Sequence, residues 1–230
     1  SNSSIKKTTN YKEILSDIDA ISLVTPTKMH YKIAKFFLEN KKHVLIEKPM
    51  TQTTLEADKL VKLAKKKKVI LQVGHLERFN PVMKKLTKEI TNPLFIEVHR
   101  LAKFNPRSTD VNVVFDLMIH DIDIVTTLIG KRIKNISAFG KKIITKSTDI
   151  ANVRIEFSGG AIANLTASRI SQKNERKIRV FEKDKYYSVD FMNSNIKKYI
   201  KNTQNKKGLF SFKEIQYDKT DALKDEINNF

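Results

Sequence analysis

Short apolar runs alternate with amphipathic helical patterns through the first ninety residues of the chain. Each run has four or five residues and is soon followed by a proline or a glycine. Strands this short and apolar, separated by helices, are typical of a parallel sheet that helices cover on both faces. The predicted strands are residues 20–24, 43–46 and 69–73, and the apolar stripes of the predicted helices lie at 33–38 and 57–64. Thr53 and Glu56 form a capping box that predicts the start of the second helix.

After Pro81 the pattern changes to short alternating segments joined by turns. Gly159-Gly160 and Asp184-Lys185 stand where the chain reverses, and such hairpins in series favour a mostly antiparallel sheet. The predicted strands are 94–98, 153–157, 161–165, 178–181 and 187–191, and a helix is predicted over 113–128. We therefore expect an α/β chain. Part of a Rossmann domain, with a doubly wound parallel sheet, would span residues 1–76, and an α+β domain with a mostly antiparallel open sheet would span 77–230.

The glycines do not supply the phosphate-binding turn with which a doubly wound nucleotide-binding half opens. The chain has six glycines, and none forms G-x-G-x-x-G after an opening strand. The sequence also begins without methionine and stops inside an apparent helix over 221–227. We therefore expect a fragment that lacks both its dinucleotide fingerprint and its C-terminal end.

Composition narrows the class of protein. Hydrophobic residues make up 40% and charged residues 30% of the chain, as in soluble globular proteins. No apolar run approaches the roughly 20 residues that span a bilayer, and the N-terminus lacks the apolar core of a signal peptide. The absence of cysteine excludes disulfides, thiolate zinc sites and a cysteine nucleophile. The expected location is a bacterial-type cytoplasm, without membrane contact.

The net charge of +19 invites a nucleic-acid interpretation. The basic residues are mostly lysines spread along the chain, and the densest run, residues 65–68, closes a helix where cations complement the dipole. Proteins that recognise nucleic acids usually use clustered arginines interleaved with aromatic residues, and this sequence shows no such pattern. We therefore expect no nucleic-acid partner, although the charge can steer an anionic substrate.

Four ordered motifs resemble those of one enzyme family. They are Thr25-Pro26-Thr27 with His30, Glu47-Lys48-Pro49-Met50, Gly74-His75 with Arg78-Phe79-Asn80-Pro81, and Asp116 with His120-Asp121-Ile122-Asp123. Their order and spacing resemble the Gfo/Idh/MocA oxidoreductases. The resemblance covers essentially the whole chain. It implies a dehydrogenase that uses NAD or NADP and acts on a sugar or a cyclitol.

Three further stretches resemble one branch of that family. They are Arg107–Val111, Asp149–Asn152 and Ser168–Ser171. The branch oxidises the 3-hydroxyl of UDP-N-acetylglucosamine on the way to a 3-amino sugar for lipid A. The resemblance therefore implies a UDP-N-acetylhexosamine as substrate. The choice between NAD and NADP stays open, because the acidic residue that decides it would lie in the missing segment.

Asp116 and His120 are the first pair of candidate catalytic residues. Oxidising a secondary alcohol requires a base for the hydroxyl proton, and histidine titrates near neutrality. Residues at i and i+4 lie on one helix face, so Asp116 can fix the imidazole tautomer and stabilise the imidazolium. The alternative is that Asp116 only complements the helix dipole and that His120 is a packing residue.

Lys48 is the third candidate. It follows a predicted parallel strand at its carboxyl end, where open α/β sheets bind ligands. Its ammonium can hydrogen-bond the reacting oxygen and lower the pKa of the alcohol. The alternative is an exposed lysine in a lysine-rich chain. The resemblance implies a cis bond before Pro49, which turns the lysine into the cleft.

The remaining candidates carry two interpretations each. Thr25, Pro26 and Thr27 face the nicotinamide ribose and pyrophosphate, or form a loop with a helix cap. The other residues expected on the cofactor side are His30, Glu47 and Arg78, of which His30 can instead be a packing residue. Asn80, Arg107 and Arg169 are expected on the substrate side, where either arginine can clamp a diphosphate or be an ordinary surface residue. No metal site is expected, since the five histidines are scattered.

Three alternatives stay open. The chain can be a non-catalytic regulator that binds a sugar or dinucleotide on the same fold, a dehydrogenase of a free sugar or inositol, or a nucleic-acid-binding protein. An apolar outer face of the second sheet would favour a homodimer or homotetramer. The dehydrogenase interpretation requires the Lys48 ammonium and the His120 imidazole to reach one small ligand.

Overall fold

A computed structural model describes residues 5, 7–106, 111–202, 209–218 and 220–230. The chain divides into two compact units. The first comprises Ser1–His75 together with Glu226–Phe230, and the second comprises Leu76–Asp225. The domain boundary predicted from the sequence, between residues 76 and 77, lies one residue from this division. The roles predicted for the two domains stay predictions.

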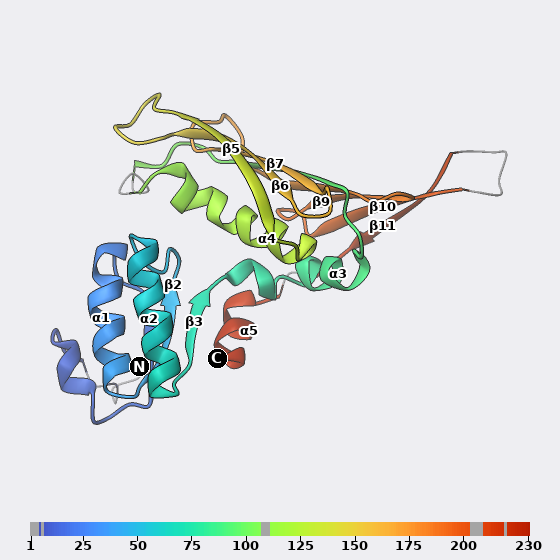
Figure 1. The fold of residues 1–230 in the computed structure, drawn as a ribbon. Helices are drawn as coiled ribbons and strands as arrows, with labels where there is room; N and C mark the ends of the chain where they lie inside the picture. Colours follow the sequence, from blue (N-terminus) through green and yellow to red (C-terminus); the bar gives the residue numbers. More distant parts are fainter. Residues whose placement is uncertain (1–4, 6, 107–110, 203–208, 219) are drawn as a thin grey trace. The chain divides into compact units, whose positions relative to one another are not determined.

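The first unit contains a three-stranded parallel sheet in the order β1-β2-β3 (Figure 1). Two helices connect the strands, as the alternating pattern predicts. The elements are β1 (Ala20–Leu23), α1 (Thr27–Glu39), β2 (His43–Glu47), α2 (Thr54–Lys67) and β3 (Leu71–Gly74), preceded by the short helix η1 (Tyr11–Ile14). The capping box predicted at Thr53 and Glu56 is present at the start of α2. Apolar side chains of β1, β2 and the two helices form the core, among them Leu23, Phe37, Val44, Ile46 and Leu60.

The second unit is built on an eight-stranded sheet in the order β11-β10-β9-β8-β4-β7-β6-β5. Neighbouring strands are antiparallel except β4 and β7, which are parallel. The strands are β4 (Phe95–Leu101), β5 (Ile133–Lys141), β6 (Ile150–Phe157), β7 (Ile162–Ser168), β8 (Glu175–Phe181), β9 (Lys185–Asp190), β10 (Asn195–Lys201) and β11 (Phe210–Gln216). The helical elements are η2 (Leu76–Phe79), α3 (Pro81–Glu89), η4 (Val114–Met118) and α4 (Ile119–Ile129). The last helix, α5 (Ala222–Asn229), begins in the second unit and ends in the first.

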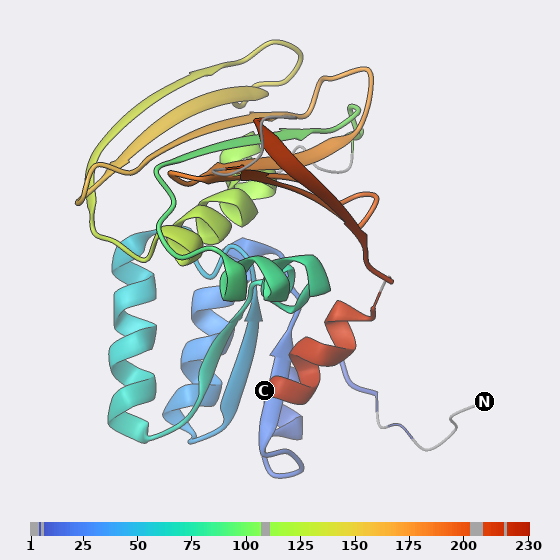
Figure 2. The same cartoon turned by 90° about the vertical axis from the view of Figure 1, so that its right-hand side faces the viewer.

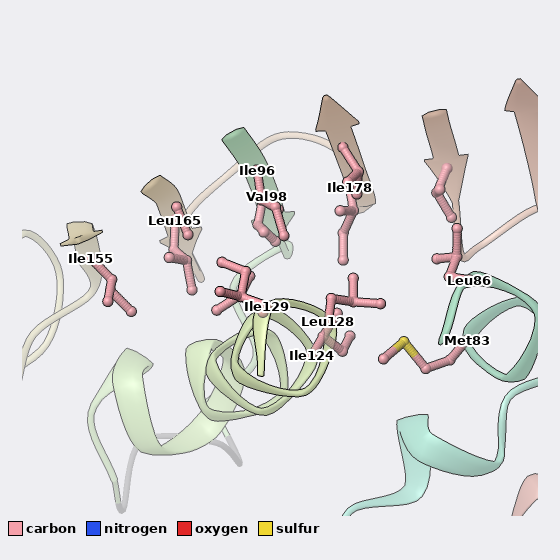
Figure 3. Packing of buried hydrophobic residues seen from close by; sticks show 14 of the residues in the cluster. Met83, Leu86, Ile96, Val98, Ile124, Leu128, Ile129, Ile155, Leu165 and Ile178 are labelled. Carbon is pink, nitrogen blue, oxygen red and sulfur yellow. The ribbon is translucent and has the colours of Figure 1, made fainter. Parts of the chain in front are cut away.

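Helices α3 and α4 lie on one face of this sheet (Figure 2). Strands β4, β6 and β7 alternate buried and less buried residues, so that every second side chain points at the helices. Figure 3 shows Val98, Leu165 and Ile178 of the sheet facing Ile124 and Leu128 of α4. This apolar contact fixes α4, which carries His120, against the sheet.

The predicted fold class is confirmed, with a parallel sheet followed by a larger, mostly antiparallel one. Both predicted hairpins are present, and Gly159 and Gly160 adopt positive φ angles of 95° and 87° in the turn between β6 and β7. The sequence did not predict β5, β10, β11 or α3. All of β5 is exposed, so burial leaves no alternation in its sequence to detect. Among the described residues, no helix has both the length and the apolar content needed to cross a membrane.

Candidate active site

The first unit gathers candidate residues at one edge of its sheet. Thr25 and Lys48 lie just beyond β1 and β2, and His75 follows β3. Because these strands are parallel, their carboxyl ends meet at the same edge, which is where open α/β sheets bind ligands. The backbone therefore brings the first two motifs of the sequence together.

His30 connects two of these loops. Its Nδ1 atom lies 2.9 Å from the carbonyl oxygen of Pro49, and its Nε2 atom lies 2.7 Å from that of Thr25. The ring comes from the first turns of α1 and is buried. The predicted cofactor contact of His30 is therefore not supported, because both ring nitrogens already face backbone carbonyls. The alternative interpretation, an internal packing residue, fits the structure.

Lys48 is half-buried, and its bond to Pro49 is cis, as the resemblance implies. The preceding carboxylate of Glu47 accepts the Lys48 backbone N–H at 3.3 Å. That carboxylate also lies against Gly74, where an added Cβ would come within 3.2 Å of it. The position of Glu47 beside the end of β3 thus depends on a glycine. Its role toward a cofactor stays a prediction.

Glu226 lies close to Glu47 in the same unit. Its side chain is buried, and one carboxylate oxygen has no hydrogen-bond partner among the described residues. Burial raises the pKa of Glu226, and the negative charge of Glu47 raises it further. The first unit therefore holds a buried carboxyl group that keeps its proton to a higher pH than an ordinary glutamate does.

In the second unit, Asp116 and His120 lie on either side of a change in helical geometry. Asp116 belongs to the π-helical turn η4, in which the Ile119 N–H donates to the Val114 carbonyl five residues earlier. His120 lies in the first turn of α4. The sequence predicted one regular helix here, and the structure corrects its first part to a π-turn. Such turns are frequent at functional sites.

The two aspartates that follow His120 are each bound by an arginine. Arg100 Nε donates to Asp121 at 2.9 Å, and the pair is buried. Burial opposes the charge of Arg100, but the Asp121 carboxylate outweighs this effect and raises the pKa of the guanidinium. Arg78 Nε donates to Asp123 at 2.9 Å, and this hydrogen bond raises the pKa of Arg78. Asp123 thus anchors its helix.

The two arginine–aspartate pairs tie the first part of α4 to two other elements of the second unit. Arg100 comes from β4 and Arg78 from η2, so the turn that carries His120 is tied to both. Arg78 was predicted on the cofactor side. Its side chain is still 53% exposed, so that role stays a prediction.

Asn80 caps α3 through its Oδ1 atom, which accepts the Val82 N–H at 3.0 Å. It also borders a cavity of about 470 Å³ within the second unit. Arg100, Asn174, Arg176 and Leu117 line the same cavity. Leu117 is the neighbour of Asp116 in the chain, and Arg176 is half-exposed. The cavity therefore offers hydrogen-bond donors and one accessible cation near the Asp116 turn.

Arg169 is buried rather than at the surface. Its guanidinium donates to the Asp149 carboxylate at 2.9 Å and to the Val111 carbonyl at 2.7 Å. We no longer expect it to clamp a diphosphate, because its donors are directed at groups of its own unit. Arg107, the other predicted clamp, lies outside the described residues.

Sequence reasoning missed Arg100 although a signal was present. Ile96, Val98 and Arg100 alternate along β4, so all three point to the buried face. An arginine on that face requires a buried acid, and the acid next to His120 supplies it. Arg176 gave no comparable signal, since it belongs to a charged, largely exposed segment of β8.

Two family descriptions match the chain. Residues 1–75 match the oxidoreductase family with an NAD-binding Rossmann fold, and residues 90–186 match the GFO/IDH/MocA C-terminal domain. The UDP-N-acetylglucosamine 3-dehydrogenase of Acidithiobacillus ferrooxidans is 37% identical over 220 residues, which cover 94% of this chain and 70% of that enzyme. The scyllo-inositol 2-dehydrogenase (NAD(+)) of Bacillus subtilis is 31% identical, covering 69% of this chain and 52% of that enzyme.

Solved structures give the same grouping. One crystal form of the A. ferrooxidans enzyme has a TM-score of 0.90 at 35% identity, covering 97% of this chain and 72% of that one. A levoglucosan dehydrogenase in complex with NADH has a TM-score of 0.81 at 20% identity, covering 91% of this chain and 64% of that one, and shares the fold. The chain belongs to the Gfo/Idh/MocA family of oxidoreductases, whose N-terminal domain is an NAD-binding Rossmann fold.

Proposed function

We propose that this protein oxidises the 3-hydroxyl of UDP-N-acetylglucosamine and transfers the hydride to NAD. The observation that carries the proposal is the 37% identity to a UDP-N-acetylglucosamine 3-dehydrogenase over 94% of the chain. The inositol dehydrogenase of B. subtilis is 31% identical over 69% of the chain. The longer alignment at higher identity favours the nucleotide sugar over inositol or a free sugar.

Thr25 provides a structural test of whether the first unit fits a cofactor. Its Oγ1 atom is buried and has no hydrogen-bond partner among the described residues. Buried polar atoms normally have a partner, and this one lies just beyond the carboxyl end of β1. We assign Thr25, Pro26 and Thr27 to contacts with the cofactor. When bound, the nicotinamide ring supplies the acceptor for the hydride.

In this proposal the chain's own residues remove the hydroxyl proton and stabilise the charges that result. His120 removes the proton of the 3-hydroxyl while hydride leaves the same carbon, so that the product is a 3-keto sugar. Asp116 orients the imidazole and stabilises its protonated form. The Lys48 ammonium donates a hydrogen bond to the reacting oxygen and stabilises the negative charge that develops there.

The half-exposed Arg176 is a better candidate than Arg169 for the substrate's diphosphate. It lines the cavity that Asn80 also borders, and its nearest acidic partner, Glu77, is 3.7 Å away. A guanidinium can bind phosphate oxygens in a bidentate way. We therefore place Asn80 and Arg176 on the substrate side.

A non-catalytic regulator on the same fold is the main alternative from another class. The presence of Lys48, Asp116 and His120 disfavours it, because a protein that only binds does not need all three. Both a dehydrogenase and a regulator could belong to this family and contain its NAD-binding domain. A measurement of substrate turnover distinguishes the two.

The test uses the full-length protein and follows reduced nicotinamide by its absorbance. UDP-N-acetylglucosamine, UDP-N-acetylgalactosamine and scyllo-inositol are compared with NAD and with NADP. We expect turnover of UDP-N-acetylglucosamine, and losses above about a hundredfold in Lys48→Ala and His120→Ala, the scale for a positioned acid or base. Lys66→Ala and His99→Ala replace residues of the same types elsewhere and are expected to keep wild-type rates.

Two results would contradict the proposal. Wild-type rates in both Lys48→Ala and His120→Ala would remove the mechanism. Binding of the nucleotide sugar without turnover under any cofactor would favour the regulator.

We also propose that copies of this protein pair through the outer face of the eight-stranded sheet. Phe95, Phe181, Tyr186, Tyr199 and Phe212 form a continuous row of ring contacts across five strands, with centroids 4.8–5.9 Å apart. Phe212 is 54% exposed, and a flat apolar face suits a self-complementary twofold interface. Sedimentation velocity of the full-length protein tests this, and a monomer at micromolar concentration would contradict it.

The proposed reaction also implies a setting. NAD and UDP-sugars are cytoplasmic metabolites, so we place the protein in the cytoplasm. A 3-keto UDP-sugar is the substrate that an aminotransferase would need to make a 3-amino sugar, as in lipid A biosynthesis. Both statements depend on the proposed substrate.

A further inference from the structure

Three sequence stretches that are far apart in the chain meet in one buried cluster of the second unit. Asp149 precedes β6, Arg169 follows β7, and Val111 precedes the helical segment with Asp116 and His120. Asp149 and Arg169 are 0% and 2% exposed. These are the three stretches that resemble the UDP-N-acetylglucosamine branch, and the function proposed above gives them no role.

Asp149 orders the loop that precedes β6. Its Oδ2 atom accepts the backbone N–H groups of Ile143, Ile144 and Thr145 at 2.8, 2.8 and 2.9 Å. Its Oδ1 atom accepts the Thr145 hydroxyl at 2.7 Å. Burial opposes the charge, but these hydrogen bonds hold the pKa of Asp149 well below its usual range. The carboxylate is therefore a fixed charge at the centre of the loop.

Arg169 connects this loop to the entrance of the helical segment. Its Nε atom donates to Asp149 Oδ1 at 2.9 Å, and its Nη1 atom donates to the Val111 carbonyl at 2.7 Å. The loop makes a second connection, because Thr148 O accepts the Val113 N–H at 2.9 Å. The backbone is thus held on both sides of Asn112.

Asn112 connects the fixed backbone to the first turn of the helical segment that contains Asp116. Its Oδ1 atom accepts the N–H groups of Val114 and Phe115 at 3.0 and 3.1 Å. Its carbonyl accepts the N–H of Asp116 at 3.0 Å. The backbone of Asp116 is therefore bonded to a residue whose two neighbours are fixed by the cluster.

We infer that the buried Asp149–Arg169 pair is a positioning device that sets the π-turn of Asp116, and through it the alignment of Asp116 with His120. The inference rests on the proposed function of those two residues. An ion pair that is buried and bonded on every side holds its neighbours in one arrangement, whereas a mobile loop would let the turn shift. A displacement of about 1 Å at a reacting group can cost a hundredfold in rate.

The first experiment measures kcat and KM of the full-length protein with UDP-N-acetylglucosamine and NAD. Arg169→Lys keeps the charge but loses the planar fork. Asn112→Ala removes the cap without touching the buried pair, and Asn112→Asp keeps a cap acceptor. We expect Arg169→Lys and Asn112→Ala to lower kcat about tenfold to a hundredfold with KM changed less than about threefold, the range that holds when partners of active groups are lost. Asn112→Asp should restore most of the rate.

The second experiment separates positioning from general stability. In the His120→Ala background, Arg169→Lys should change the residual single-turnover rate less than about twofold, because residues that act through one another are not additive. Val189→Ala, in the core of the same sheet, is the control for lost stability. It should lower the unfolding midpoint and leave kcat unchanged.

The outcomes are distinct. A full effect of Arg169→Lys in the His120→Ala background, or kcat within about twofold in both Arg169→Lys and Asn112→Ala, overturns the inference. A raised KM with unchanged kcat in Arg169→Lys also overturns it and restores a substrate contact. Wild-type turnover in His120→Ala instead overturns the role proposed for His120, on which the inference rests.

Discussion

Two buried carboxyl groups, Asp149 in the second unit and Glu226 in the first, are held in opposite ways. In the second unit, hydrogen bonds hold the pKa of Asp149 low, and the carboxylate pairs with the buried Arg169. Asp121 pairs with the buried Arg100, but burial outweighs this pairing and raises the pKa of Asp121. In the first unit, Glu226 lies near another carboxylate, and burial raises its pKa. A buried charge is stable only when it is paired and hydrogen-bonded. The charge of Asp149 is thus stabilised by its partners, whereas the charge of Glu226 is opposed by its surroundings.

The candidate catalytic groups of the two units are also held by different kinds of contact. Lys48 sits in a loop that backbone geometry and the ring of His30 hold at the sheet edge. His120 sits between elements that arginine–carboxylate pairs tie together. From this difference we expect the loss of Arg100 to destabilise the protein and the loss of the Glu226 charge to stabilise it.

The largest expected effect comes from breaking the pair beside His120. Arg100→Met removes the guanidinium and leaves Asp121 buried with its main partner gone. We expect the free energy of unfolding to fall by about 3–5 kcal/mol, the usual loss when a buried pair loses one partner. Urea denaturation of the full-length protein, followed by tyrosine fluorescence, measures the change.

A matched substitution on the outer face sharpens this result. Arg179 pairs with Glu97 at 3.3 Å, and its side chain is 54% exposed. Arg179→Met should therefore cost less than about 1 kcal/mol. Equal losses in the two variants would show that the buried pair has no special role.

The smallest expected effect is a gain of stability, in contrast to the losses expected for the arginine variants, and it comes from Glu226. Because burial raises the pKa of Glu226, the folded protein holds this proton more tightly than the unfolded chain does. Its contribution to stability is complete below the ordinary glutamate pKa of about 4.3 and is lost as pH rises through the raised value. Glu226→Gln should therefore stabilise the protein at pH 8, and should stabilise it less at pH 4, where the wild-type carboxyl group holds its proton in both states.

Denaturation midpoints at the two pH values test this prediction. Glu39→Gln, at the exposed end of α1, is the control and should show neither the gain nor its pH dependence. A loss of stability in Glu226→Gln at pH 8 would mean that its carboxylate is charged and paired in the folded protein.

Local pattern predicted the parts of the fold that burial marks clearly. The first sheet is predicted from short apolar runs, of which β2 is buried along most of its length while β1 and β3 are only partly buried. The hairpins of the second sheet alternate because one face is buried. The exposed β5 and the lysine-bearing β10 and β11 carry weaker alternation, and the sequence did not predict them. Arg169 was placed on the substrate side because its sequence position does not reveal a buried acid twenty residues away.

The sequence by itself determined the alternation of strands and helices, the capping box at Thr53 and Glu56, and the motifs that carry Lys48, Asp116 and His120. Those features depend on residues that are close in the chain. Only the tertiary structure decided that His30 joins two loops, that Arg100 and Arg78 bind the aspartates after His120, and that Asp149 and Arg169 meet. Each of these contacts joins segments whose proximity arises from the packing of separate elements, and no local propensity encodes it.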